Sequence, residues 1–150
     1  MKYPRPALLT LLSLLALLLT ACSKPADPVV EIEQVIEDIR SALDERSNAG
    51  VREHLADSFL GGHEGQHNLD REAVRKLLAG YFLRYRNIQV LITSLEIQPD
   101  PVEPRLAQMQ GTAALSGGNT VLPESARLYR FQGQWRKFGD DWKLTTFSWE

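Results

Sequence analysis

The stretch GGHEGQHNLD, from Gly61 to Asp70, carries the residues whose types and spacing are best suited to chemistry. His63, Glu64 and His67 match the H-E-x-x-H pattern of zinc proteases, in which two histidines one helical turn apart bind the metal and the glutamate acts as a base. That geometry needs a continuous helix, but two glycines precede the motif and Gly65 lies inside it. Because glycine weakens a helix by roughly 1 kcal/mol relative to alanine, the composition predicts a polar loop.

Two alternatives remain open for this loop. A metal site within the loop would use His63 and His67, with His54 as a third ligand. A catalytic zinc site would need its third ligand from the helix that follows, which offers no histidine and only Glu72 near its start. The sequence therefore predicts no metal site, and His63 and His67 are the candidates if one exists.

The N-terminal segment is typical of a cleaved signal peptide. Lys2 and Arg5 precede an apolar run over residues 7–19, which is shorter than the roughly 20 apolar residues that span a bilayer. Leu-Thr-Ala-Cys follows directly and resembles the lipobox of bacterial lipoproteins. That resemblance implies cleavage before Cys22, a diacylglycerol thioether on its sulfur and acylation of the new amine. The alternative is an ordinary secretory signal followed by a cysteine by chance.

Lipidation at this position sets several further expectations. Cleavage would remove residues 1–21 and leave 129 of the 150 residues, with 22–28 as a short tether and 29–150 as one domain. Cys22 is the only cysteine, so no thiol is left for a disulfide and the fold depends on its core. Ser23 stands where an aspartate would, by resemblance to enterobacterial lipoproteins, imply inner-membrane retention. We expect an anchor in the outer membrane, facing the periplasm, and no cofactor besides the covalent lipid.

Charge argues against nucleic acid as a partner. The formal net charge is −2 for the whole chain and becomes −4 once Lys2 and Arg5 are removed with the signal peptide. The sequence contains no basic stripe of the kind that neutralises phosphates. The expected partners are therefore the membrane, through the lipid, and a small molecule or another protein.

Three segments show the apolar spacing of amphipathic helices, at residues 29–46, 49–60 and 71–87. Asp27 is the expected N-cap of the first, and Asp70 or Asn68 that of the third. In the second segment the apolar side of the predicted helix is formed by Val51, Leu55 and Phe59. The third has the most regular periodicity, carried by Val74, Leu77, Leu78, Tyr81, Phe82 and Tyr85.

After residue 87 the pattern changes to the alternation of β-strands. Strands are predicted at 88–98, 105–117, 126–138 and 142–150, with a bulge near Gly133 and turns after residues 116 and 138. Three helices followed by an antiparallel meander indicate an α+β fold, with the helices packed on the inner face of one curved sheet.

This layout resembles the nuclear transport factor 2-like, or cystatin-like, cone fold. The resemblance covers residues 29–150, and its most diagnostic part is the final hairpin from Tyr129 to Trp149. It implies a strongly curved sheet around a long helix, with a conical cavity whose open end is lined by apolar and aromatic side chains. Such a cavity is a natural pocket for a small ligand.

The resemblance also implies a test for enzymatic activity. Isomerases of this fold use an aspartate base and an oxyanion hole made of one tyrosine and one protonated aspartate. The first predicted helix holds no tyrosine, residues 60–64 stand where the base should lie, and the last two strands offer only Gln134 and Thr146. The sequence favours a non-catalytic envelope lipoprotein that binds a small ligand or a protein partner. The alternative is a small pocket enzyme of isomerase, cyclase or hydrolase type.

Five residues are the candidates for the pocket of either kind of protein. Tyr81 and Tyr85 lie on the third predicted helix, and Gln134, Trp135 and Trp142 lie on the final hairpin. The alternative for the tyrosines is ordinary core packing. The tryptophans are equally consistent with the packing surface of a hairpin or with a homodimer formed through the sheet face.

Overall fold

The computed structural model describes residues 26–118 and 125–150. The predicted signal peptide and Cys22 lie outside these residues. The elements, in chain order, are α2 (Pro28–Asp44), α3 (Asn48–Glu53), β1 (Leu55–His63), α4 (Arg71–Arg84), β2 (Asn87–Pro99), β3 (Leu106–Gly118), β4 (Ser125–Phe138) and β5 (Asp141–Trp149).

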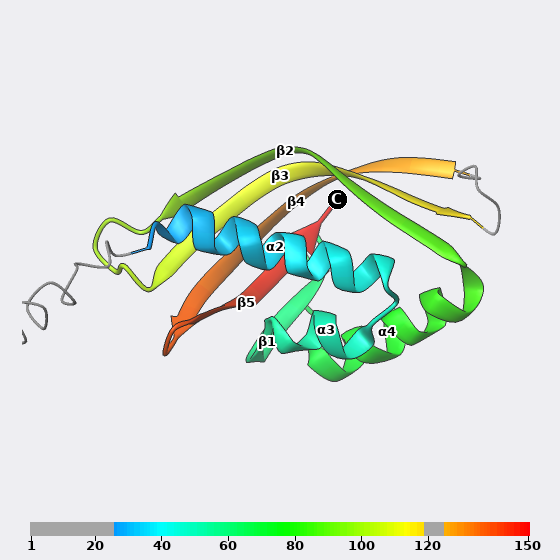
Figure 1. The fold of residues 1–150 in the computed structure, drawn as a ribbon, viewed down its shortest axis with the longest axis horizontal. Coiled ribbons are helices and arrows are strands. Elements are labelled where there is room, and N and C mark those ends of the chain that lie inside the picture. Colours follow the sequence, from blue (N-terminus) through cyan, green and yellow to red (C-terminus); the bar gives the residue numbers. More distant parts are fainter. Residues whose placement is uncertain (1–25, 119–124) are drawn as a thin grey trace, which may run out of the picture.

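The five strands form one sheet in the order β1-β5-β4-β3-β2. The predicted meander is confirmed, because β2, β3, β4 and β5 pair antiparallel in sequence order. The prediction of a purely antiparallel sheet is wrong, since β1 joins the edge of β5 in parallel. The three helices lie on one side of this mixed sheet, and in Figure 1 the long strands β2 to β4 bend as they pass over α2.

The two long helices begin where their caps were predicted. The carboxylate of Asp27 accepts a hydrogen bond from the backbone N–H of Val29 at 3.0 Å, and that of Asp70 accepts one from Ala73 at 2.7 Å. Each bond satisfies an amide that has no partner within its helix. The ends differ slightly from the prediction, because α4 stops at Arg84 before the extended residue Tyr85.

The second predicted helix is wrong over most of its length. It ends at Glu53, and Leu55–His63 forms strand β1 instead. Leu55 and Phe59 are both buried, which mimics the four-residue spacing of a helix. The pairing of β1 with β5 shifts register between Leu55 and Leu60, so the strand loses its regular two-residue alternation there.

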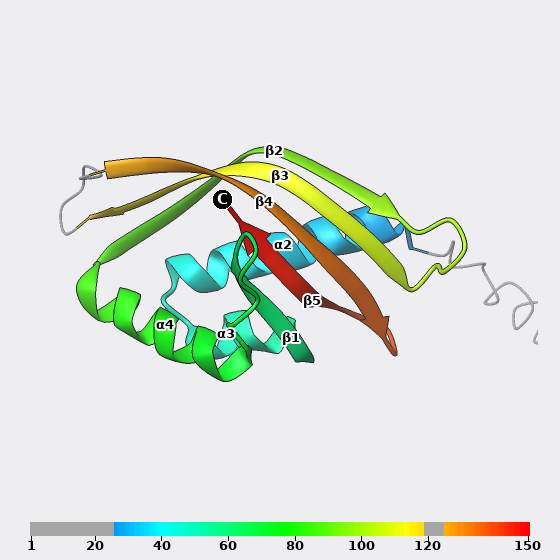
Figure 2. The same cartoon turned by 180° about the vertical axis from the view of Figure 1, so that it is seen from behind.

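The core lies between α2, β1 and the inner face of the sheet. Ile32 on α2 is 0% exposed and Trp135 on β4 is 1% exposed. They belong to one buried cluster with residues from β1, β3 and β5 (Leu55, Phe59, Ala107, Met109, Trp142 and Leu144). Figure 2 shows from behind how β1 lies beside β5, with α3 and α4 next to β1.

Two irregularities interrupt the long strands. The β2–β3 register shifts between Ile92 and Ser94, and the β4–β5 register shifts between Gln134 and Trp135. The second lies next to Gly133, where the sequence predicted a bulge. Such shifts bend a strand and increase its local twist. Within the described ranges, no helix is both long enough and apolar enough to cross a membrane.

Candidate functional site

A cavity of about 280 Å³ lies between the helices and the inner face of the sheet. Every layer of the fold contributes apolar side chains to its wall, among them Ile36 and Ile39 from α2, Val74 and Leu78 from α4, Ala113 from β3 and Phe147 from β5. The volume is close to the lower end of the range of small-molecule pockets, which are mostly apolar. The inner faces of these elements therefore enclose a space suited to an apolar ligand.

Arg40 is the one ionisable residue among the described residues that line this cavity. Its guanidinium is already paired with acids of its own helix, donating to Glu37 at 2.8 Å and to Asp44 at 3.2 Å. The hydrogen bond from Arg40 lowers the pKa of Glu37, and the same bond raises the pKa of Arg40. The charge of Arg40 is therefore matched outside the cavity, which leaves an apolar interior.

Helix α4 forms one side of the cavity. Leu77 on this helix lines the cavity and is also 41% exposed. One turn further along the helix, the ring of Tyr81 stacks on that of Tyr85, with centroids 6.0 Å apart. A side chain placed at Gly117 would lie 3.3 Å from the Tyr85 ring, so this ring rests against the backbone of β3. The two tyrosines thus pack on each other and on β3, and neither is among the residues that line the cavity.

The five predicted pocket residues do not come together in one place. Trp135 contributes to the cavity wall from the inner face of β4, whereas Tyr81 and Tyr85 stack on each other and do not line the cavity. Trp142 is buried and donates its indole N–H to Glu31 at 2.8 Å, which ties β5 to α2. Gln134 is exposed on the opposite face of the sheet, where it borders separate hollows.

The HEGQH motif lies in a loop, as the sequence predicted. His63 is the last residue of β1, and Gly61 exchanges two backbone hydrogen bonds with Leu69, at 2.8 and 2.9 Å, which close the loop. His63 and His67 therefore do not occupy one helical face. Among the residues that the structure describes, no group of three metal-binding side chains is close enough to hold an ion.

The cavity wall contains residues that the sequence reasoning did not single out. Ile36, Ile39 and Val74 were identified only as apolar helix positions, and Ala113 was identified only as a strand residue. The useful signal was Ala113 itself, because a small side chain on the inner face of a long strand leaves space above it. Tertiary packing decides which core residues lie next to a void. The periodicity of the sequence carries no information about that packing.

No protein-family model and no curated protein sequence matches the chain. Solved structures do match it. They include an NTF2-like protein of unknown function from Pseudomonas putida (15% identity, TM-score 0.68, covering 84% of this chain and 89% of that one). A protein with a cystatin-like fold from Nostoc punctiforme aligns at 13% identity and TM-score 0.66, over 85% of this chain and 94% of that one. A proposed dehydratase of the NTF2-like family from Streptomyces avermitilis aligns at 18% identity and TM-score 0.67, over 81% and 93%. At these identities the likeness shows the fold alone: the chain has the nuclear transport factor 2-like, cystatin-like fold.

Proposed function

We propose that this protein is a lipid-anchored envelope protein that binds a small apolar molecule without transforming it. The observation that carries the proposal is the cavity of about 280 Å³ with apolar walls. Arg40 is the single ionisable residue among its described lining residues, and its charge is matched by Glu37 and Asp44. Burial of apolar surface contributes roughly 25 cal/mol per Å². A ligand that fills such a space gains affinity chiefly from burial.

The anchor is the second part of the proposal. It rests on the lipobox-like residues before Cys22 and on the short tether over 22–28. A diacylglycerol thioether and an acylated amine at Cys22 would hold the domain at the periplasmic side of the outer membrane. In this proposal a curved sheet forms the cone around the cavity. Two acyl groups suffice for stable membrane attachment, whereas one chain binds only reversibly.

The alternative is a pocket enzyme. It is suggested by the structural similarity to the Streptomyces avermitilis protein, which is named as a proposed dehydratase. Dehydration or isomerisation needs a general acid or base within hydrogen-bond reach of the substrate. The described lining of this cavity offers only Arg40 as an ionisable group, and its charge is already paired. Binding is therefore the better-supported function.

The cavity can be tested by filling it. Ala113→Phe places a ring on the inner face of β3, whereas Ala114→Phe places the same ring on the opposite face of the same strand and serves as the matched control. We expect small apolar molecules to copurify with the full chain in nanodiscs, and mass spectrometry of the released compounds should show at least a tenfold loss in Ala113→Phe only.

Two results would count against the proposal. The copurified compounds could be the same in both variants and in empty nanodiscs, which would mean that the cavity holds nothing specific. Alternatively, turnover of a recovered compound by the wild-type protein would favour the enzyme. Circular dichroism spectra of both variants establish that each one is folded.

A further inference from the structure

Helix α4 carries large apolar side chains that remain in contact with solvent. Leu83 is 88% exposed, Tyr81 is 44% exposed and Leu77 is 41% exposed. The helix packs mainly against α3 and β1, and it lies at the margin of the molecule in Figures 1 and 2. Single exposed apolar residues are common on any protein, whereas a group of them on one helix is typical of a contact surface.

These apolar residues share one side of the helix with two cations. Beyond Glu72, the exposed residues of α4 form a single surface, the α4 face, which consists of Lys76, Leu77, Gly80, Tyr81, Leu83 and Arg84. Lys76, Gly80 and Arg84 follow one line along the helix, because four residues make slightly more than one turn. Leu77 and Tyr81 lie on one flank of this line, and Leu83 lies on the other. A Cβ at Gly80 would have no atom within 4 Å, so the middle of the α4 face is open.

The positive charge of the α4 face is not balanced by acids. Residues 73–95 contain no aspartate and no glutamate, although the whole chain has a net charge of −2. Lys76, Arg84 and the adjoining Arg86 are exposed and form no ion pair with any residue that the structure describes. The guanidinium of Arg84 instead lies 5.6 Å from the centre of the Tyr85 ring. Three cations are therefore available to an anionic surface.

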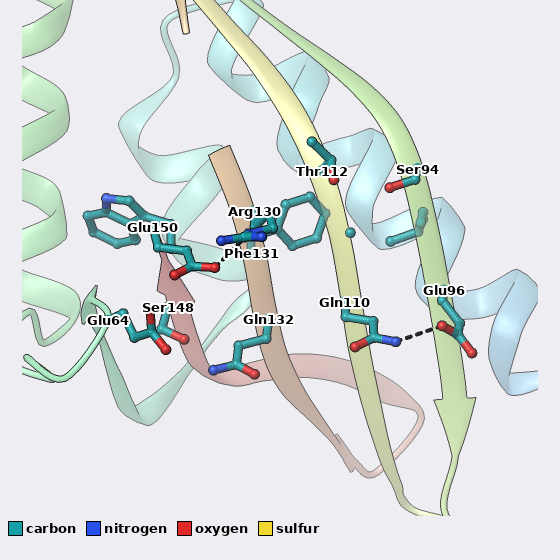
Figure 3. A pocket seen from close by; sticks show the side chains of 13 residues that line it. Glu64, Ser94, Glu96, Gln110, Thr112, Arg130, Phe131, Gln132, Ser148 and Glu150 are labelled. Carbon is teal, nitrogen blue, oxygen red and sulfur yellow. Dashed lines mark hydrogen bonds and ion pairs between the residues drawn. The ribbon is translucent and has the colours of Figure 1, made fainter. Parts of the chain in front are cut away.

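The sheet offers a contrast in charge. Three glutamates, Glu64, Glu96 and Glu150, line a groove over the strands (Figure 3). Arg130 is the one cation among the described residues of that groove, and its Nε is paired with Glu150 at 2.6 Å. The molecule thus has an acidic surface on the sheet and a basic one on α4. An anionic partner is attracted to the second and repelled by the first.

We propose that the α4 face docks on a bilayer that contains anionic phospholipids, as a second, non-covalent contact besides the proposed anchor. Leucine and tyrosine side chains enter the headgroup region, while the three cations pair with lipid phosphates. A helix with this combination lies in the plane of the interface. A fluid lipid surface adapts to a convex helix and lets long cationic side chains reach the headgroups. Docking would place the cavity, which the inner side of α4 borders, about one helix diameter (~10 Å) from the lipid.

Photolabelling of the full chain in nanodiscs tests this contact. The discs contain a phospholipid with a diazirine near its headgroup, and mass spectrometry of peptides locates the lipid adducts. With about one third phosphatidylglycerol, we expect adducts on residues 76–86, and at least threefold fewer in discs of phosphatidylcholine alone. The double variant Lys76→Gln/Arg84→Gln should lose labelling to the same extent. Arg105→Gln/Arg136→Gln removes the same charge from exposed positions away from α4 and is the matched control.

Leu83→Ser separates insertion from general attraction between opposite charges. It changes no charge, and we expect at least a threefold loss of labelling on α4 with an unchanged thermal midpoint. Val102→Ser, at a position that is 84% exposed, is its control.

Three results would overturn the proposal. Neutral and anionic discs could label α4 equally, or a control variant could lose as much labelling as its partner variant. Size-exclusion chromatography could also show a dimer that Lys76→Gln/Arg84→Gln dissociates, which would mean that a second copy of the chain covers the α4 face. Any of these leaves the proposed apolar ligand and the anchor at Cys22 untouched, because neither uses the α4 face cations.

Discussion

Glu31 connects the first helix to the last two strands. Its carboxylate accepts a hydrogen bond from the ammonium of Lys137 on β4 at 2.6 Å and one from the indole of Trp142 on β5 at 2.8 Å. The side chains of Glu31 and Lys137 are only 27% and 22% exposed, so solvent screens this pair less than a surface ion pair. The contact fixes α2 on the inner face of the final hairpin.

Glu31→Gln should destabilise the protein by about 1 to 2 kcal/mol, since hydrogen bonds to a charged group are stronger than those to a neutral amide. Urea unfolding at pH 7, followed by circular dichroism, measures the change. Glu33→Gln on the same helix is exposed and serves as the control. Equal stability of the two variants would show that the Lys137 and Trp142 contacts contribute nothing.

The same contact has a pH signature. The hydrogen bonds from Lys137 and then Trp142 lower the pKa of Glu31 below its value in the unfolded chain. A lowered acid pKa stabilises the fold above the unfolded value and loses that contribution as the pH falls through the folded value. The stability difference between wild type and Glu31→Gln should therefore shrink as the pH is lowered below about 4.5, the unshifted value.

At the scale of elements, the sequence predicted the two long helices, their caps and the four-stranded meander, because each has a strong local signal. It failed at β1. The exposed Asp57 between the buried Leu55 and Phe59 excludes simple two-residue alternation, so the pattern fits a helix better than a strand. Only the pairing with β5, nearly ninety residues away, makes this segment extended. Non-local pairing of that kind leaves no trace in local periodicity.

The double glycine before the motif has a structural role that the loop reveals. A Cβ at Gly62 would lie 1.7 Å from the carbonyl oxygen of Gln66, so the loop closes only because no side chain is there. Gly62→Ala should cost about 2 kcal/mol or more, since the backbone must move. Gly80→Ala is the contrasting control, because nothing lies near its Cβ and α4 should gain about 0.5 to 1 kcal/mol.

Thermal unfolding monitored by circular dichroism distinguishes these two glycine variants. The expected result is a lower midpoint for Gly62→Ala and a higher one for Gly80→Ala. An unchanged midpoint for Gly62→Ala would mean that the loop from His63 to Leu69 is free to adopt another path. The open space around a Cβ at Gly80 argues against close packing of α4 at this residue.

At the scale of the whole molecule, the sequence predicted a pocket inside the fold more successfully than the residues that line it. Of the five candidates, only Trp135 lies in the cavity wall. Large aromatic side chains were predicted to line the pocket. The cavity is instead bordered largely by small or aliphatic residues such as Ala113 and Val74.

The proposed anchor makes a prediction about the entire protein. In a bacterial host, Cys22→Ser should block lipidation, and the chain should then remain unprocessed or appear in the soluble fraction. Fractionation with immunoblotting, together with metabolic labelling by an acyl-chain probe, measures both effects. Ser23→Ala, which leaves the thiol in place, is the control. Membrane association that persists unchanged in Cys22→Ser would contradict the anchor.

The position of β5 between β1 and β4 determines when the chain can finish folding during synthesis. Glu31 can form its hydrogen bonds with Lys137 and Trp142 only after more than a hundred further residues have been synthesised. Strand β1 likewise has no partner strand until β5 has been synthesised. Contacts this distant in sequence form slowly because a long loop must close first. If the proposed signal peptide directs this chain across a membrane, the first helix and the first strand cross it before their partners have arrived. Chaperones on the far side would then meet the apolar surfaces of both before the last strand, of nine residues, covers them.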